Sequence, residues 1–219
     1  ELHSAVAAHD LIFPMTFGAK GSAMIGGMLS TNAGGSNVLK YGNTRDLCLG
    51  LEVVLPTGEI MNVMSELHKD NSGYNLKHLM IGAEGTLGII TAAVVKLSPK
   101  PKAEATAMIA AESLDEALRI LNRLQAATDG SVQAFEYMPG AYLEAFCAHF
   151  PNKRAPFDII YKTNVMVELG STIASMSKPD RLEKLNLRNC WKTFWRMNTT
   201  AGLCSICLLY TSPSPRDRQ

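Results

Sequence analysis

Two glycine-rich segments hold the residues whose types and spacing indicate chemistry. The first reads Gly18-Ala19-Lys20-Gly21-Ser22-Ala23-Met24-Ile25-Gly26-Gly27 and continues as Ser30-Thr31-Asn32-Ala33-Gly34-Gly35; the second reads Gly82-Ala83-Glu84-Gly85-Thr86-Leu87-Gly88-Ile89-Ile90. Because glycine has no Cβ and adopts unusual φ values, several backbone N–H groups can converge on one anion. The hydroxyl groups of Ser22, Ser30 and Thr31 are further donors. The pattern predicts a site for a diphosphate, which backbone dipoles hold without many lysines.

Neither of the two standard phosphate motifs occurs in these segments. A Walker A loop contains Gly-Lys-Ser or Gly-Lys-Thr, and no glycine here is followed by Lys-Ser or Lys-Thr. The Gly-x-Gly-x-x-Gly fingerprint of dinucleotide-binding folds is also absent. An ordinary ATP or nicotinamide site is therefore disfavoured. The competing interpretation is that the glycines only form tight turns and close packing, but two dense clusters joined by a hairpin favour a cofactor site.

No other residues form a recognisable catalytic or metal-binding set. The five histidines are isolated in the sequence: His3, His9, His68, His78 and His149. The single C-x-x-C string, Cys204-Ser205-Ile206-Cys207, lacks the second pair that a zinc site needs. We interpret Lys20, Lys40 and Arg45 as solvated surface charges rather than phosphate ligands. The sequence predicts no metal site in this chain, and its catalytic residues are unknown.

Composition limits the classes of protein that fit. The chain has 219 residues, of which 47% are hydrophobic, enough for one large domain or two small ones. Its 21 basic and 20 acidic residues give a net charge of +1, which argues against general electrostatic binding to nucleic acid or anionic membranes. No apolar run reaches the roughly 18 residues of a membrane span. The five cysteines, an odd number, favour a reducing compartment, the cytoplasm or alternatively the mitochondrial matrix.

The first region, residues 1–100, reads as strands and turns around the two segments. Apolar and β-branched residues predict a strand over 47–55, and Pro56-Thr57-Gly58 predicts a turn into a second strand over 59–63. A short helix over 74–81 would place Leu76, Leu79 and Met80 on one side and end at Gly82. A further strand is predicted over 89–97. Ser98-Pro99-Lys100-Pro101 should join no ladder and mark a domain boundary.

The second region, residues 101–170, alternates strands with helices. Strands are predicted over 106–110, 132–137 and 158–168, and helices over 114–128 and 140–150. The first helix has a capping box in Ser113 and Glu116, with Leu114, Ala117, Leu118, Leu121 and Leu124 at helical spacing. This order predicts a sheet with helices on one face. Residues 171–219 have no steady period and are expected not to belong to the fold; the last nine resemble translated sequencing adapter.

Five motifs in order resemble a known family. They are residues 14–35, Tyr41-Gly42, Leu51-Glu52-Val53-Val54-Leu55, Asp70-Asn71-Ser72-Gly73-Tyr74-Asn75-Leu76 and Gly82-Ala83-Glu84-Gly85-Thr86-Leu87-Gly88-Ile89-Ile90-Thr91. Together they resemble the FAD-linked oxidases of the vanillyl-alcohol-oxidase (PCMH) type, and within them the D-lactate and D-2-hydroxyglutarate dehydrogenases. The resemblance implies an α+β fold: part of a PCMH-type FAD-binding domain over residues 1–100, then the first half of a ferredoxin-like cap domain over 101–170.

The resemblance also implies which residues bind FAD, without a covalent link. The loop along the diphosphate and ribityl chain is matched by Gly21, Ser22, Gly26 and Gly27. The segment that continues past the flavin is matched by Thr31, Asn32, Gly34 and Gly35. The strand entry on the adenosine side is matched by Glu84, Gly85, Gly88 and Ile89. Pro14 matches a position just ahead of the loop.

The implied activity is that of an FAD-dependent 2-hydroxy-acid dehydrogenase. Such enzymes transfer hydride from the α-carbon of a D-2-hydroxy acid to flavin N5, a base takes the hydroxyl proton, and electrons pass to a separate acceptor. The implied partners are therefore a small 2-hydroxy acid and an electron acceptor, with no nucleic acid and no transmembrane segment.

Two parts of the family pattern are missing from the chain. The other diphosphate loop belongs upstream of Glu1, and a His-rich metal cluster belongs downstream of Gly170. We therefore expect an inactive fragment, with a divalent metal only in the full-length parent. Two alternatives stay open: a non-catalytic nucleotide- or protein-binding module of the same fold, and an alcohol or sugar oxidase of the same superfamily.

Overall fold

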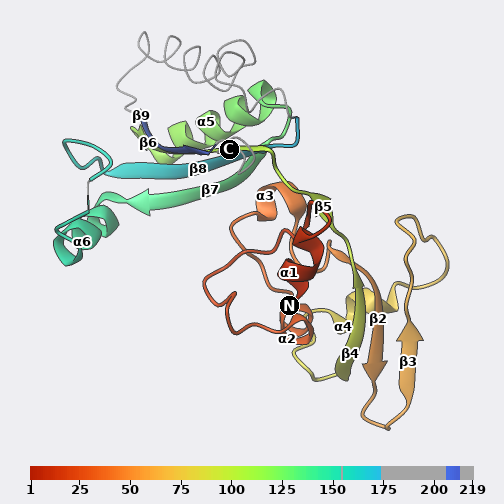
Figure 1. The fold of residues 1–219 in the computed structure, drawn as a ribbon. Helices are drawn as coiled ribbons and strands as arrows, with labels where there is room; N and C mark the ends of the chain where they lie inside the picture. The colour runs from red at the N-terminus through yellow and green to blue at the C-terminus, as the bar shows by residue number, and fades with distance from the viewer. Residues whose placement is uncertain (154, 174–205, 213–219) are drawn as a thin grey trace. The chain divides into compact units, whose positions relative to one another are not determined.

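The chain folds as two compact units, Glu1–Lys100 and Pro101–Gln219 (Figure 1). This structure is a computed structural model, and it describes residues 1–153, 155–173 and 206–212. Both units combine helices with antiparallel strands, which confirms the α+β class. Most of the predicted C-terminal region 171–219, including Cys204, lies outside the described residues. None of the helices in the described ranges has the length and apolar character needed to cross a bilayer.

The first unit is built on an antiparallel sheet with the strand order β3-β2-β4. The strands of this sheet are β2 (Cys48–Val54), β3 (Ile60–Val63) and β4 (Ile89–Val95). A separate pair joins β1 (Leu11–Ile12) to β5 (Ser98–Pro99). The helices are α1 (Leu2–Ala7), α2 (Ile25–Ser30), α3 (Val38–Tyr41) and α4 (Leu76–Met80).

The predicted hairpin is confirmed in β2 and β3. The turn between them is closed by two backbone hydrogen bonds of 2.9 Å, from Gly58 N–H to the Leu55 carbonyl and from Leu55 N–H to the Glu59 carbonyl. Gly58 has φ +86°, a left-handed value that glycine adopts at little cost. Leu51 and Val53 alternate along β2 and are fully buried. A slip of one residue would expose both side chains, so their burial fixes the register of the hairpin.

The core of the first unit lies between this sheet and two of the short helices. Leu51 and Val53 share a buried cluster with Leu29 of α2 and Met80 of α4. The helix α4 is shorter than predicted, because the side chain of Asn75 accepts a hydrogen bond from His78 N–H at 3.3 Å and caps it there. Met80 is buried as predicted, but the two leucines of the expected stripe, Leu76 and Leu79, are exposed.

The prediction that residues 98–101 join no ladder is wrong. Ser98 and Pro99 form β5 and pair antiparallel with Ile12 and Leu11 of β1. The N–H of Lys100 extends the pairing by donating to the Asp10 carbonyl at 2.9 Å. Proline is tolerated because it lacks only the donor, and a strand in a two-stranded pair has one side without a ladder.

The second unit contains one antiparallel sheet with the strand order β7-β8-β6-β9. Its strands are β6 (Ala103–Ala111), β7 (Val132–Pro139), β8 (Thr163–Ser171) and β9 (Ile206–Ser212). Its helices are α5 (Leu114–Ala127) and α6 (Gly140–His149). Since β8 runs antiparallel to both β6 and β7, those two strands are parallel, and α5 is the crossover between them. This is a split β-α-β arrangement.

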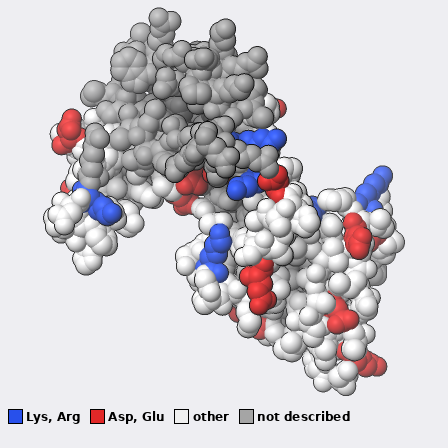
Figure 2. Space-filling model, viewed as in Figure 1, with Lys and Arg blue, Asp and Glu red and all other residues white. Residues whose placement is uncertain are grey.

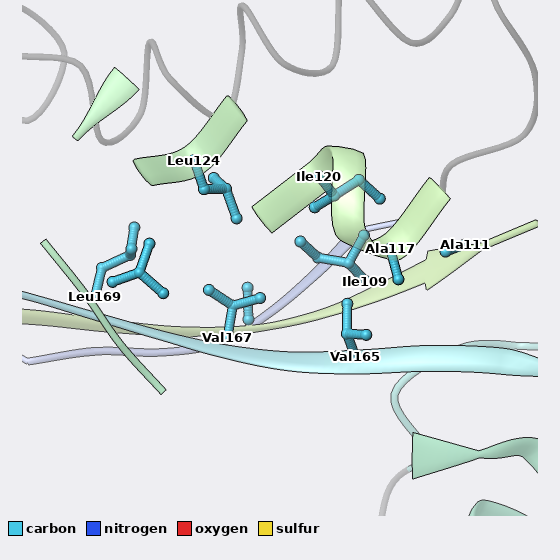
Figure 3. Close-up of a cluster of buried hydrophobic side chains, with 10 residues drawn as sticks. Ile109, Ala111, Ala117, Ile120, Leu124, Val165, Val167 and Leu169 are labelled. Atoms are coloured by element: carbon cyan, nitrogen blue, oxygen red, sulfur yellow. The ribbon is translucent and has the colours of Figure 1, made fainter. Parts of the chain in front are cut away.

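The helix α5 confirms the most strongly periodic prediction in the chain. The Ser113 hydroxyl oxygen accepts a hydrogen bond from Glu116 N–H at 3.1 Å, one of the two bonds of the predicted capping box, while the Glu116 carboxylate accepts from Arg119 at 3.3 Å. Figure 3 shows Ala117, Ile120 and Leu124 directed toward the sheet. The core there also contains residues of β6 and β8, namely Ile109, Ala111, Val165, Val167 and Leu169. Two residues of the expected stripe, Leu114 and Leu118, are exposed instead.

Two predictions for the second unit need correction. The strand expected over 158–168 is β8, which begins only at Thr163, and the apolar run before it is a loop in which Ile159 is 62% exposed. An apolar run alone does not separate a strand from a loop. Of the two helices in the described part of this unit, α5 covers the predicted face of the sheet, while α6 lies beyond the end of β7 (Figure 1). The apolar side chains of α6 do not form one stripe, since Leu143 is buried but Tyr142 and Phe146 are exposed.

Three glutamates occupy the sheet face opposite α5. Side chains alternate along a strand, so Glu168 points away from the core that holds Val167 and Leu169. Partial burial, and then the negative charges of Glu104 on β6 and Glu136 on β7, raise the pKa of Glu168. The folded chain therefore binds a proton at Glu168 more tightly than the unfolded chain does. The resulting contribution to stability is fully present below the ordinary glutamate pKa of about 4.3 and is lost as the pH rises through the higher folded-state value.

We expect Glu168→Gln to stabilise the second unit at pH 7 and to have little effect at pH 4. The gain at pH 7 should be at most about 1 kcal/mol, because solvent screens a half-buried carboxylate. Thermal unfolding at both pH values measures the difference. Glu144→Gln, on the exposed surface of α6, is the control and should leave the pH dependence unchanged. A loss of stability at pH 7 in Glu168→Gln would contradict the expected repulsion.

Candidate functional site

The first glycine segment begins as an exposed loop and continues into α2. Residues 18–22 are exposed, and the loop is closed by the N–H of Ser22, which donates to the Ala19 carbonyl at 3.0 Å. The Ser22 hydroxyl donates to the same oxygen at 3.3 Å. The Thr31 hydroxyl donates to the Gly27 carbonyl at 2.9 Å. Two of the three hydroxyls expected as anion donors therefore bond to the segment itself.

Some of the glycines are required by close packing within the protein. A Cβ on Gly35 would overlap the carbonyl oxygen of Thr16, which runs beside it. A Cβ on Gly88 would lie 2.7 Å from Cγ1 of Val53 and 2.8 Å from the carbonyl oxygen of Val54. These contacts support the packing interpretation at Gly35 and Gly88, because any side chain there would displace a neighbouring strand or loop.

Three other glycines have no packing role of this kind. A Cβ added to Gly18, Gly21 or Gly27 would meet no atom within 4 Å, and none of the three has φ in the left-handed range. No contact in the described part of the chain therefore requires glycine at these positions. A bare backbone facing open space fits a ligand that lies against the main chain, as the predicted diphosphate does.

The structure brings the two glycine segments together at the end of α2. Gly82 N–H donates to the Leu29 carbonyl at 3.0 Å, and Glu84 N–H donates to the Ser30 carbonyl at 2.9 Å. These carbonyls belong to the last turn of α2, beyond the regular i+4 ladder of the helix, and the Leu29 carbonyl also accepts from Asn32 N–H at 3.0 Å. The second segment therefore completes the hydrogen bonding of α2. Residues 36–81 separate the two segments in sequence, yet these hydrogen bonds bring them into contact.

Left-handed backbone conformations occur on both sides of this junction. Among the described residues, the non-glycine residues with positive φ include Asn32 at +47° and Glu84 at +52°. Asn32 directly follows the last turn of α2, and Glu84 precedes Gly85, which has φ +80°. Asparagine tolerates this conformation better than glutamate does. Both residues are among those predicted to bind the cofactor.

Arg45 was missed by the sequence reasoning and lies at the same junction. Its N–H donates to Oδ1 of Asn32 at 3.0 Å, and its guanidinium donates to the carbonyls of His78 and, at 2.6 Å, Ile81. The interpretation of Arg45 as a solvated surface charge is therefore wrong. Its partners are 33 and 36 residues away in sequence, so no local pattern indicates them.

A small hollow opens beside the first segment. It has a volume of about 100 Å³ and an apolar wall that includes Phe13, Met15 and Met28, with His3 and Lys20 also lining it. Burial, and then the positive charge of Lys20, lower the pKa of His3. An imidazole that is harder to protonate than a free histidine and an apolar wall therefore lie next to the exposed loop.

A second hollow of about 260 Å³ is formed by the Asp70-to-Leu76 motif. The motif folds over Leu49 and Val63, and Lys77 contributes to the wall. Within it, Ser72 donates both its N–H and its hydroxyl to Asp70, which holds the pKa of Asp70 below its usual range. The motif therefore organises its own loop around a hollow in the first unit.

The predicted site residues differ in their accessibility. The exposed ones are Gly21, Ser22, Gly27, Thr31, Gly34, Glu84, Gly85 and Ile89. The half-buried ones are Gly26, Asn32, Gly35 and Gly88. Pro14 is buried, between two core residues, Phe13 and Met15. Most of the predicted site residues are therefore accessible to a ligand, whereas Pro14 is part of the core next to the loop.

Metal-binding groups and charge patches do not mark this surface. Among residues 1–153, 155–173 and 206–212, no three His, Cys, Asp or Glu side chains lie close enough to hold a metal ion. On the face drawn in Figure 2, lysines, arginines, aspartates and glutamates are scattered singly. An anion at the glycine segments would therefore depend mainly on backbone N–H groups.

Comparison with known proteins finds similarity to an FAD binding domain and to D-2-hydroxyglutarate dehydrogenases. The FAD binding domain family matches residues 1–64. Mitochondrial D-2-hydroxyglutarate dehydrogenase of Rattus norvegicus is 40% identical over 168 residues, which are 75% of this chain and 31% of the rat protein. D-2-hydroxyglutarate dehydrogenase of Xanthomonas citri pv. viticola is 38% identical over 170 residues, 78% of this chain and 35% of that protein. The chain thus spans about a third of the length of these relatives.

Two further comparisons agree. D-2-hydroxyglutarate–pyruvate transhydrogenase of Saccharomyces cerevisiae is 36% identical over 172 residues, 78% of this chain and 35% of the yeast protein. Among solved structures, an alkyldihydroxyacetonephosphate synthase matches with a TM-score of 0.64 and 19% identity, covering 98% of this chain and 40% of that one. At this identity the structural match speaks for the fold alone.

We expect alanine at Gly35 and at Gly27 to have opposite effects on stability. Gly35→Ala should lower the free energy of unfolding by about 1–3 kcal/mol, because the new Cβ overlaps the Thr16 carbonyl. Gly27→Ala should raise it by about 0.5–1 kcal/mol, since alanine favours a helix and the site is open. Urea unfolding measures the change in the free energy of unfolding for each variant, and amide hydrogen exchange in β2 provides a second measurement. Equal destabilisation by the two substitutions would contradict the distinction.

Proposed function

Because residues 1–64 belong to the FAD binding domain family, we propose that this chain is part of an FAD-dependent enzyme that oxidises a D-2-hydroxy acid. The observation that carries the proposal is the junction at the end of α2, where two distant glycine segments meet beside glycines with no packing role. The relatives named D-2-hydroxyglutarate dehydrogenase support a substrate of the D-2-hydroxyglutarate or D-lactate class.

The exposed main chain of the first segment would hold the cofactor without a covalent link. Gly21, Ser22, Gly26 and Gly27 would lie along the diphosphate and ribityl chain. Thr31, Asn32, Gly34 and Gly35 would continue past the flavin, and Glu84, Gly85, Gly88 and Ile89 would face the adenosine. Backbone N–H groups suit this role because they supply partial positive charge without flexible side chains. The open space at Gly21 and Gly27 supports it.

Bound FAD supplies a two-electron acceptor that can take a hydride from the α-carbon of the hydroxy acid. The residues of this chain bind and orient the cofactor, and no residue in it is proposed as the base. The base, the separate electron acceptor site and any divalent metal are proposed for other parts of the parent protein, since the chain spans only 31–35% of its relatives.

We assign residues 101–170 to the first half of a ferredoxin-like cap domain. The strand order β7-β8-β6, with α5 crossing over between the parallel strands β6 and β7, supports this assignment. A ferredoxin-like sheet places its third strand between the first two in the same way. In such an enzyme the cap covers the substrate side of the flavin.

The compartment is proposed to be the cytoplasm, with the mitochondrial matrix as the alternative. The relative from Rattus norvegicus is named as mitochondrial, and the one from Xanthomonas citri is not.

The isolated 219-residue chain should bind FAD weakly, because half of the cleft would lie elsewhere in the parent. Titration with FAD, followed by flavin fluorescence, measures the affinity. Gly27→Ala should weaken binding about tenfold, which corresponds to about 1.4 kcal/mol, while raising stability. Leu118→Ala, an exposed position on α5, is the control. Tight stoichiometric retention of flavin by the wild-type chain would contradict the proposed division of the site.

The full-length parent provides the decisive test of the reaction. We expect it to purify as a yellow protein whose visible flavin absorbance is bleached under anaerobic conditions by D-2-hydroxyglutarate or D-lactate. The L enantiomers, simple alcohols and sugars are the comparison substrates. Bleaching by alcohols or sugars alone would indicate an oxidase of another substrate class. A parent with no flavin, or with flavin that no hydroxy acid reduces, would overturn the proposal.

A further inference from the structure

Arg45 connects the two glycine segments through both its backbone and its side chain. Its N–H donates to Oδ1 of Asn32 in the first segment at 3.0 Å. Its guanidinium donates to the carbonyls of His78 and Ile81, the latter at 2.6 Å and directly before Gly82. We infer that Arg45 is a positioning residue that sets the place of the second segment relative to the first. The positioning role itself does not depend on the proposed function; only its consequence, the shape of the flavin site, rests on that function.

The base of the Arg45 side chain is fixed to the first segment. Its neighbour Thr44 is fully buried and donates to the Ala33 carbonyl twice, from N–H at 3.0 Å and from its hydroxyl at 2.6 Å. Asn32 reaches Arg45 from the left-handed conformation that ends α2. Because the backbone of Arg45 is held in place, its side chain can fix the position of the residues to which it donates hydrogen bonds.

The tip of the side chain is fixed to the end of α4. The last carbonyls of a helix have no intrahelical donor and carry the negative end of the helix dipole. A guanidinium satisfies two such carbonyls at once with a planar fork, which a lysine ammonium does not reproduce. Arg45 is half-buried, so these charge-assisted hydrogen bonds are less exposed to competition from water.

Gly82 provides independent support for this contact. Its φ is +82°, and a Cβ there would lie 3.1 Å from Nη2 of Arg45 and 3.4 Å from Cβ of Asn32. The bare α-carbon of Gly82 thus makes room for both residues that link the segments. The N–H of the same glycine donates to the Leu29 carbonyl at 3.0 Å. Arg45, Asn32, Gly82 and the last turn of α2 therefore form a closed ring of contacts.

Amide hydrogen exchange in the apo chain tests the inference without any flavin. In Arg45→Met, exchange at the Gly82 and Glu84 amides should accelerate about tenfold relative to wild type, as expected for losing charge-assisted hydrogen bonds. The amides of Leu51 and Val53 in β2 should keep their rates. Arg45→Lys should give an intermediate acceleration, and Arg119→Met, on the surface of α5, should give none.

A double-mutant cycle gives a second measurement, which remains interpretable if Arg45→Met partly destabilises the first unit. Gly82→Ala should lower the folding equilibrium constant by a smaller factor in the Arg45→Met background than in wild type, because the contact with Nη2 is gone. Equal factors would overturn the inference. So would unchanged exchange at Gly82 and Glu84, or an acceleration that β2 shares equally, which would indicate general destabilisation.

FAD titration of the same variants separates this inference from the proposed function. If the wild-type chain binds FAD, Arg45→Met should weaken binding about tenfold while Arg119→Met leaves it unchanged. If the exchange results are as expected but neither the chain nor its parent binds FAD, Arg45 still positions the segment and only the proposed function fails. If exchange at Gly82 and Glu84 does not respond, the inference fails whatever the flavin result.

Discussion

The junction at the end of α2 is the constraint on which the rest of the first unit depends. The carbonyls in the last turn of α2 lie beyond the i+4 ladder of this six-residue helix and can accept from donors outside it. The second glycine segment supplies two of those donors, from Gly82 and Glu84. Gly82 has φ +82°, and a Cβ there would lie 3.1 Å from Nη2 of Arg45 and 3.4 Å from Cβ of Asn32. The preference for glycine at Gly82 therefore follows from its backbone conformation and these two side chains before any ligand is considered.

The sheet determines where each segment enters and leaves this junction. Leu51 and Val53 bury one face of β2 and fix its register with β3 and β4. The strand β4 begins at Ile89, directly after Gly88, whose missing side chain lets Val53 and Val54 approach. The second segment is thus held at one end by the sheet and at the other by α4. Its geometry is a consequence of packing rather than of local turn preference alone.

The sequence predicts those parts of this structure that depend on local patterns. The hairpin and α5 follow from alternation, helical spacing and a capping serine, all readable within about fifteen residues. Local patterns fail at β5, because Pro99 joins a ladder whose other strand, β1, is distant in sequence. Arg45 is a stronger case, since its acceptors are the carbonyls of His78 in α4 and of Ile81 directly after α4. The placement of the glycines along the chain indicates the two segments, but the distinction between packed and open glycines depends on neighbours that are distant in sequence.

Some residues of the first unit lower its stability without any packing reason, which supports a functional role for the glycines with open space around them, Gly18, Gly21 and Gly27. Gly27 in a helix and Glu84 in a left-handed conformation each lower stability relative to an ordinary residue in an ordinary conformation. The unit offsets these costs with a core of Leu29, Leu51 and Val53. At Gly35 and Gly88, close packing against neighbouring atoms is sufficient to explain the glycine. Gly27 and Glu84 are both exposed, and such costs at exposed residues fit a binding site, because they add nothing to the stability of the protein without its ligand.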